Sequence, residues 1–181
     1  MKMILTLLVM LSLQAYGERI KLPDGWRLPT EKELAGEERD NERNSTNSVS
    51  RYSQAQGDFN GDGQADTAYI LISTEFRGDA LFLYVSSNDQ YSWLPLEISN
   101  WDKAYPEKSY VYTAPNMGLG TLSPDTFRRY VKNAWVTPDD ITPKEADFSN
   151  PALDYFRFES AGSLYFWSNN EMRFVRFWYS D

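Results

Sequence analysis

Residues 58–66 constrain the fold most, because they form an acidic, glycine-containing turn that leads directly into a strand. Oxygen-bearing side chains recur there at alternate positions. Ca²⁺ takes about six to eight oxygen ligands, and a short loop supplies them only if alternate side chains point inward and glycine allows a sharp turn. The sequence therefore predicts a calcium loop whose side-chain ligands are Asp58, Asn60, Asp62 and Asp66, with Gln64 contributing its backbone carbonyl.

The residues after this loop argue against an EF-hand. An EF-hand carries a bidentate Glu at loop position 12 and continues into a helix. This chain has Tyr69 at that position, inside the β-branched and aromatic run 67–74, which is typical of a strand. The simpler alternative to a metal site is a pair of Asn-Gly and Asp-Gly turns, which are acidic because turns favour these residues.

Residues 57–66 resemble the calcium loop of FG-GAP and VCBS-type repeats, in which Asp-x-Asn-x-Asp-Gly-x-x-Asp opens into a strand. The resemblance implies that Asp66 completes the metal shell in place of the missing Glu. Such repeats usually stack into propellers, but this sequence contains one loop of the kind, which argues against a propeller. As a whole, the chain also resembles small exported bacterial proteins of uncharacterised function, a likeness that implies no activity.

Composition removes several classes of chemistry. The 181 residues include neither His nor Cys, so nucleophile–histidine systems and the usual zinc, haem and iron–sulfur ligands are excluded. The formal net charge of −8 argues against nucleic acid and anionic lipid as partners. A divalent cation or a basic protein surface is favoured instead.

Residues 1–17 have the pattern of a secretory signal peptide. Lys2 precedes an apolar run from 3 to 13, and Ala15 and Gly17 place small residues before a plausible cleavage site. The run is shorter than the roughly 20 apolar residues of a membrane span. We therefore expect export to the periplasm or the extracellular space, with residues 18–181 forming a single β-rich domain that is not inserted in a membrane.

The remaining pattern predicts a mainly β fold with minor α content (α+β), as an antiparallel sheet or sandwich. A capping box at Thr30 and Glu33 predicts one short N-terminal helix over 31–40. Ser123 as N-cap predicts a second short helix. Period-2 and aromatic patterns predict strands over 52–56, 67–74, 80–86, 93–98, 153–159, 163–167 and 173–178.

Three functions remain open from the sequence. The first is an exported, non-enzymatic domain in which Ca²⁺ structures the loop and the surface binds a protein or glycan. The second is a periplasmic inhibitor or immunity protein directed against a secreted toxin or hydrolase. The third is a carboxylate-pair glycoside hydrolase, with candidate acids Asp139, Asp140, Glu145, Asp154 and Glu159. The C-terminal aromatic strands are interpreted as core, or alternatively as a groove for sugar or peptide.

Overall fold

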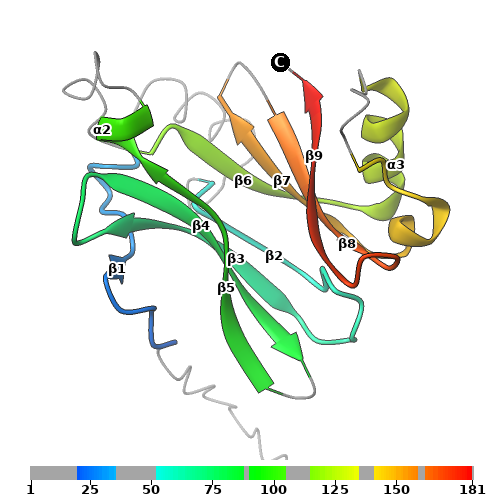
Figure 1. Ribbon diagram of the computed structural model, residues 1–181, viewed down its shortest axis with the longest axis horizontal. Coiled ribbons are helices and arrows are strands. Elements are labelled where there is room, and N and C mark those ends of the chain that lie inside the picture. The colour runs from blue at the N-terminus through cyan, green and yellow to red at the C-terminus, as the bar shows by residue number, and fades with distance from the viewer. Residues whose placement is uncertain are drawn as a thin grey trace, which may run out of the picture.

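The computed structural model describes residues 20–35, 52–87, 90–104, 115–134, 141–158 and 162–180. The predicted signal peptide lies outside these ranges. In the part of the chain that is described, two antiparallel sheets dominate and the helices are short, which confirms the mainly β prediction (Figure 1). None of the helices in these ranges is long and apolar enough to cross a membrane.

The first sheet has the order β1-β3-β4-β5. A fifth strand, β2, pairs with β3 along the same edge as β1. Its strands are β1 (Trp26–Arg27), β2 (Gln54–Gly57), β3 (Asp66–Ser73), β4 (Gly78–Ser87) and β5 (Gln90–Asn100). The helical turn α2 (Trp101–Ala104) follows β5. The central strands β3 and β4 are buried on both faces, because successive side chains point to opposite sides of a sheet and both sets are largely apolar. One face contributes Ala68, Ile70, Leu81 and Leu83 to the main core cluster, and the other carries a second cluster of Leu71, Ala80 and Phe82.

The second sheet has the order β6-β7-β8-β9. Its strands are β6 (Met117–Leu122), β7 (Ala152–Arg157), β8 (Gly162–Ser168) and β9 (Arg173–Ser180). Helix α3 (Pro124–Asn133) begins after the predicted N-cap Ser123, and the short 3₁₀ helix η1 (Glu145–Ser149) precedes β7. Both helices cover the outer face of this sheet, where Phe127 and Phe148 pack on Phe166 and Phe177.

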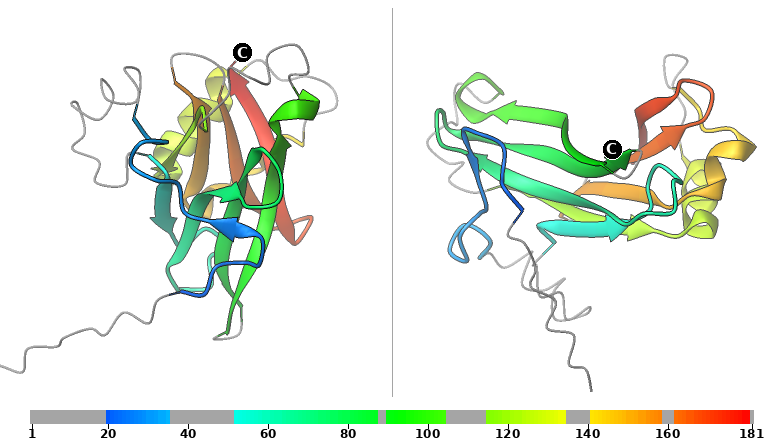
Figure 2. Two further views of the ribbon diagram at one scale, coloured as in Figure 1. Left: turned by 90° about the vertical axis from the view of Figure 1, so that its left-hand side faces the viewer. Right: turned by 90° about the horizontal axis from the view of Figure 1, so that it is seen from below.

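The two sheets meet along β2 and β6 and curve away from this seam as a trough (Figure 2). The Leu119 N–H donates to the Tyr52 carbonyl (2.8 Å) and the Thr121 hydroxyl to the Gln56 carbonyl (2.8 Å) across it. Side chains from both sheets fill the trough with one core cluster: Ala55, Phe59, Ala68, Ile70, Leu81, Leu83, Leu119, Leu153, Tyr155 and Tyr165. Strands β5 and β9 end the two sheets and border the open side, which we call the mouth.

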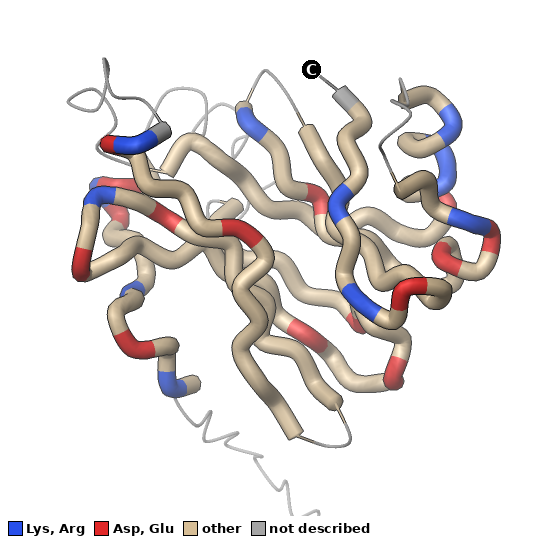
Figure 3. The backbone as a smooth tube through the Cα atoms, viewed as in Figure 1, with Lys and Arg blue, Asp and Glu red and all other residues tan. Residues whose placement is uncertain are grey.

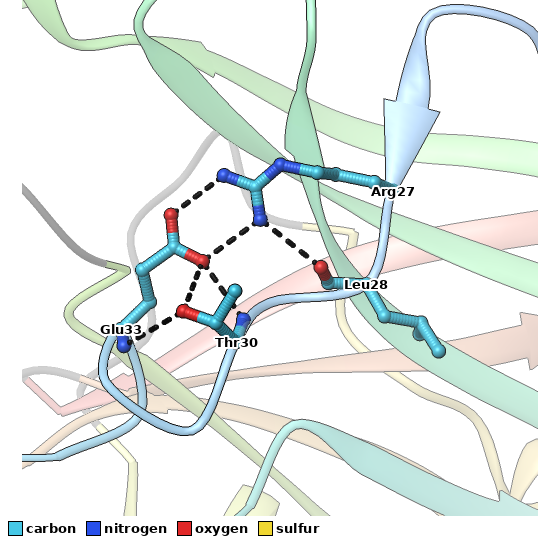
Figure 4. Close-up of polar contacts among 4 residues, drawn as sticks. All are labelled: Arg27, Leu28, Thr30 and Glu33. Atoms are coloured by element: carbon cyan, nitrogen blue, oxygen red, sulfur yellow. Dashed lines mark hydrogen bonds and ion pairs between the residues drawn. The ribbon is translucent and has the colours of Figure 1, made fainter.

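The predicted N-terminal helix is wrong for its described part, because residues 31–34 form turns. The capping box itself is present: Glu33 Oε2 accepts from the backbone N–H (2.8 Å) and hydroxyl (2.9 Å) of Thr30 (Figure 4). Arg27 also donates to both oxygens of Glu33 (2.7 and 2.8 Å), and this contact is the main reason that the pKa of Glu33 falls to about 2. The capping box thus fastens a turn to β1. The rest of the predicted helix, residues 36–40, lies outside the described ranges.

The predicted strand positions are confirmed to within a few residues, with two differences. The first predicted strand begins at Gln54 because Tyr52 adopts a positive φ of 61°, which breaks an extended chain. The alternation predicted for β7 also fails, since Ala152, Leu153, Asp154 and Tyr155 are all buried. This strand is central in its sheet, with the trough on one face and α3 and η1 on the other.

Candidate functional site

The acidic loop joins β2 to β3 and wraps around the carboxylate of Asp58. Its Oδ1 accepts from the backbone N–H groups of Gly61 (2.8 Å) and Asp62 (3.0 Å), and its Oδ2 from Gly63 (2.9 Å). Gly61 and Gly63 have φ angles of +76° and +86°, in the left-handed region that glycine adopts without strain. The predicted role of the two glycines in turning the backbone is therefore present in the structure.

Ser86, near the end of β4, ties the loop to the first sheet by three hydrogen bonds. Its hydroxyl donates to Asp62 Oδ2 through a short bond, its carbonyl accepts from Asn60 Nδ2 (2.7 Å), and its N–H donates to Asp66 Oδ1 (3.0 Å). The Ser86 hydroxyl is the main cause of the lowered pKa of Asp62. Sequence reasoning missed Ser86, because a serine 20 residues beyond the loop carries no local signal.

Asp66 points into the protein and is fully buried. Its Oδ2 accepts from the Phe59 N–H (2.9 Å), and its Oδ1 accepts from the Ser86 N–H. The Phe59 side chain is itself buried in the core. Burial raises the pKa of Asp66, although the backbone donors act in the opposite direction. Both carboxylate oxygens therefore anchor the loop from a buried position, whereas the other predicted ligands are half-buried or exposed.

The remaining predicted ligands lie together on the outer part of the loop. Asp58 and Asn60 are half-buried, Asp62 and Gln64 are exposed, and Asp62 Oδ1 accepts the Gln64 N–H (2.8 Å). The loop 58–66 contains three Asp residues and no Lys or Arg (Figure 3). Among the described residues, no Lys or Arg forms an ion pair with Asp58 or Asp62.

The chemistry of this donor set fits a hard cation, because carboxylate, amide and carbonyl oxygens are the ligands that Ca²⁺ takes. Within the described ranges, no cluster of three or more His, Cys, Asp or Glu side chains is arranged to hold a metal. The side-chain donors on the outer part of the loop are accordingly two carboxylates, Asp58 and Asp62, and the Asn60 amide. Gln64 would contribute its backbone carbonyl.

A second site lies at the mouth of the trough, where a cleft of about 210 Å³ separates the two sheets. Glu97 of β5 and Arg176 of β9 meet across it at 2.5 Å, and the Tyr165 hydroxyl donates to the same Glu97 oxygen (2.7 Å). The Arg176 guanidinium carbon lies 3.8 Å from the centre of the Trp178 ring. This contact bridges the mouth at one point through side chains that come from opposite sheets.

A buried carboxylate also lines this cleft. Asp79 of β4 is 3 % exposed and its Oδ1 accepts the indole N–H of Trp101 (2.6 Å). The nearby Tyr155 is also buried, and its pKa is raised well above the ordinary value, first by burial and then by the charges of Asp79 and Glu97. Aromatic rings and charged groups thus line the cleft together, although the sequence had assigned the C-terminal aromatic strands mainly to the core.

The two described candidate acids of the glycosidase hypothesis, Glu145 and Asp154, do not line this cleft. Glu145 is exposed and pairs with Arg128 on the outer surface (2.8 Å). Asp154 lies on the outer side of β7, where it accepts from the Tyr179 hydroxyl (2.9 Å), and burial raises its pKa to about 6. The other candidates, Asp139, Asp140 and Glu159, lie outside the described residues.

Comparison with protein-family models, with curated proteins and with solved structures found no match to this chain.

Proposed function

We propose that this chain is an exported, non-enzymatic binding domain in which Ca²⁺ stabilises the loop 58–66. Asp58, Asn60 and Asp62 would hold the ion together with the Gln64 carbonyl. The ion would neutralise the charge of the loop and fix its outer part, while Asp66 and Ser86 fasten the loop to the sheet. The signal-peptide pattern of residues 1–17 supports the proposal, because extracellular calcium modules work with weak sites of roughly 10⁻⁴–10⁻³ M.

The observation that carries the proposal is a pair of acidic side chains, Asp58 and Asp62, whose hydrogen-bond donors are all uncharged. The two residues lie four positions apart in one loop, where the Asp62 N–H donates to Asp58 Oδ1 (3.0 Å), and no described Lys or Arg forms an ion pair with either carboxylate. Like charges at such a spacing repel each other unless a cation or water screens them. A bound divalent ion removes this repulsion and uses the oxygen atoms that the loop presents.

The test is thermal unfolding of the signal-free protein with chelator and with increasing Ca²⁺. An ion that binds only the folded state stabilises it by about 2.7 kcal/mol at a hundredfold excess over Kd. For a chain of this length, such a gain raises the melting temperature by roughly 5–10 °C. An unchanged melting temperature up to about 10 mM Ca²⁺, some tenfold above the weakest extracellular modules, refutes the proposal.

Matched variants separate a specific site from general screening of negative charge. Asp58→Asn and Asp62→Asn should each remove most of the calcium effect. Asp24→Asn changes the charge by the same amount on a side chain that is 96 % exposed and far from the loop in sequence, and it should keep the full effect. Equal calcium stabilisation of all three variants contradicts a site in the loop.

The mouth cleft gives the glycoside hydrolase hypothesis a new pair of carboxylates, Asp79 and Glu97. Hydrolysis of this kind needs one carboxyl that keeps a proton. Arg176 and Tyr165 already occupy the Glu97 carboxylate, and the Trp101 indole N–H occupies Asp79. We therefore favour binding over catalysis at this cleft. Release of nitrophenol from aryl glycosides, abolished in Asp79→Asn, would reverse this preference.

A further inference from the structure

We propose that the mouth cleft binds a short, uncharged oligosaccharide. The inference rests on the proposed role of the chain as a binding domain, but it does not depend on the calcium loop. It combines the extended shape of the mouth, the internal balance of its charges and the aromatic surface of Trp178.

The shape of the mouth suits a chain-like ligand. The cleft of about 210 Å³ shares Glu97, Arg176 and Trp178 with a neighbouring, more open depression of about 550 Å³. The three shared residues therefore lie at the junction of one continuous groove between β5 and β9. Binding sites for small ligands often lie at the mouths of β-barrels and between packed elements, and a groove of two connected parts can hold more than one sugar ring.

The charges of the cleft favour an uncharged ligand. Two carboxylates, Asp79 and Glu97, and two guanidinium groups, Arg157 and Arg176, line it. Glu97 is already paired with Arg176, so a charged ligand would have to displace that partner and leave the other charge without compensation. A hydroxyl group can instead donate to a carboxylate oxygen and accept from a guanidinium N–H without breaking the pair.

Trp178 supplies the apolar surface that a sugar ring needs. Its side chain is 41 % exposed, although neighbouring Phe177 is fully buried. Strand β9 therefore directs Phe177 into the cluster beneath α3 and Trp178 toward the mouth. Arg176 lies over the Trp178 ring and holds it in place. Trp has an apolar body and a polar N–H, a combination suited to the C–H face and the hydroxyls of a sugar.

The experiment follows tryptophan fluorescence and NMR shifts during titration with cellotetraose, maltotetraose and chitotetraose, each in chelator and in Ca²⁺. Binding of at least one probe with a Kd below about 10 mM is expected. Its affinity should stay constant between low and high salt, because an uncharged ligand has no net Coulomb attraction to be screened. Trigalacturonate, an acidic probe, should bind at least tenfold more weakly.

Matched variants locate the site. Trp178→Ala should weaken binding at least tenfold, and Trp178→Phe should retain part of the affinity if the substitution leaves the fold intact by circular dichroism. Tyr91→Ala is the control, since Tyr91 is equally exposed (41 %) but lies outside the groove. The inference is overturned if no neutral probe binds, if only trigalacturonate binds, or if Tyr91→Ala has the same effect. A calcium-dependent melting temperature without sugar binding would refute this inference alone.

Discussion

Replacing Asp66 tests whether this residue anchors the loop or completes a metal shell. In the structure, its two oxygens accept the N–H groups of Phe59 and Ser86 in a fully buried position. Asp66→Ala removes both acceptors and leaves two donors without a partner. Asp66→Asn keeps one acceptor and directs an amide NH₂ at the second donor, so its effect should be intermediate.

The magnitude follows from the cost of unsatisfied donors. A buried N–H that loses its partner costs about 1–3 kcal/mol, so two cost about 2–6 kcal/mol. Removing a carboxylate whose pKa is raised by burial recovers part of this loss. We expect the free energy of unfolding to fall by about 3 kcal/mol in Asp66→Ala and by about half of that in Asp66→Asn, which corresponds to melting temperatures lower by roughly 6–12 °C and 3–6 °C.

The assay is urea unfolding in chelator, repeated with saturating Ca²⁺. Asp58→Ala is the control, because its N–H partners are exposed and water replaces the lost acceptor, so in chelator it should cost less than about 1 kcal/mol. If Asp66→Ala costs less than about 0.5 kcal/mol in chelator and its deficit emerges only with Ca²⁺, the anchoring role is refuted and Asp66 is a ligand, as the FG-GAP resemblance implies.

Two further predictions concern single buried contacts. Ser86→Ala should lower the free energy of unfolding by about 1 kcal/mol and raise the pKa of Asp62 in an NMR titration, since the hydroxyl bond is lost and the backbone bonds remain; equal shifts in the exposed control Ser87→Ala would contradict this. Asp154 has a folded-state pKa of about 6, against the ordinary 3.8. Its contribution to stability is therefore complete below pH 4, and the free energy of unfolding falls by about 3 kcal/mol as the pH rises from there through 6. The stability difference between the native chain and Asp154→Asn, measured in urea from pH 4 to 7, should follow this curve, and a constant difference would disprove the assignment.

Local patterns predicted much of the sheet structure. Strands β3, β4, β8 and β9 follow β-branched and aromatic runs, and Ser123 begins α3 as expected, since its hydroxyl accepts the Thr126 N–H. Strand β6 was missed because two glycines interrupt its six residues and lower its β-propensity. The helix expected after Thr30 was wrong because Glu33 forms its capping contacts within a single turn that Arg27 fixes to β1.

The candidate sites were predictable to different degrees. The loop was visible because its oxygen-bearing residues lie within nine positions, but the pattern could not show that Asp66 points inward. The mouth cleft depends on Glu97 and Arg176, which are 79 residues apart and meet only because β5 and β9 end their sheets on the same side. Sequence periodicity describes the faces of a strand and contains no information about which edges of two sheets come together.

The outer edge of β5 has a consequence for the behaviour of the chain in solution. This strand pairs with β4 along one edge, and no described strand pairs with its other edge. Its 11 residues, with exposed Tyr91, Leu94 and Ile98, are therefore a template onto which another copy could add and begin a fibril. Pro95 removes one N–H from the middle of that strand, and the register shift beside it leaves Leu96 as an extra residue in β5 and distorts the pairing. Glu97 adds a charged side chain to the same strand. Substituting Pro95 or Glu97 should therefore increase self-association at high protein concentration, even where the folded monomer remains stable.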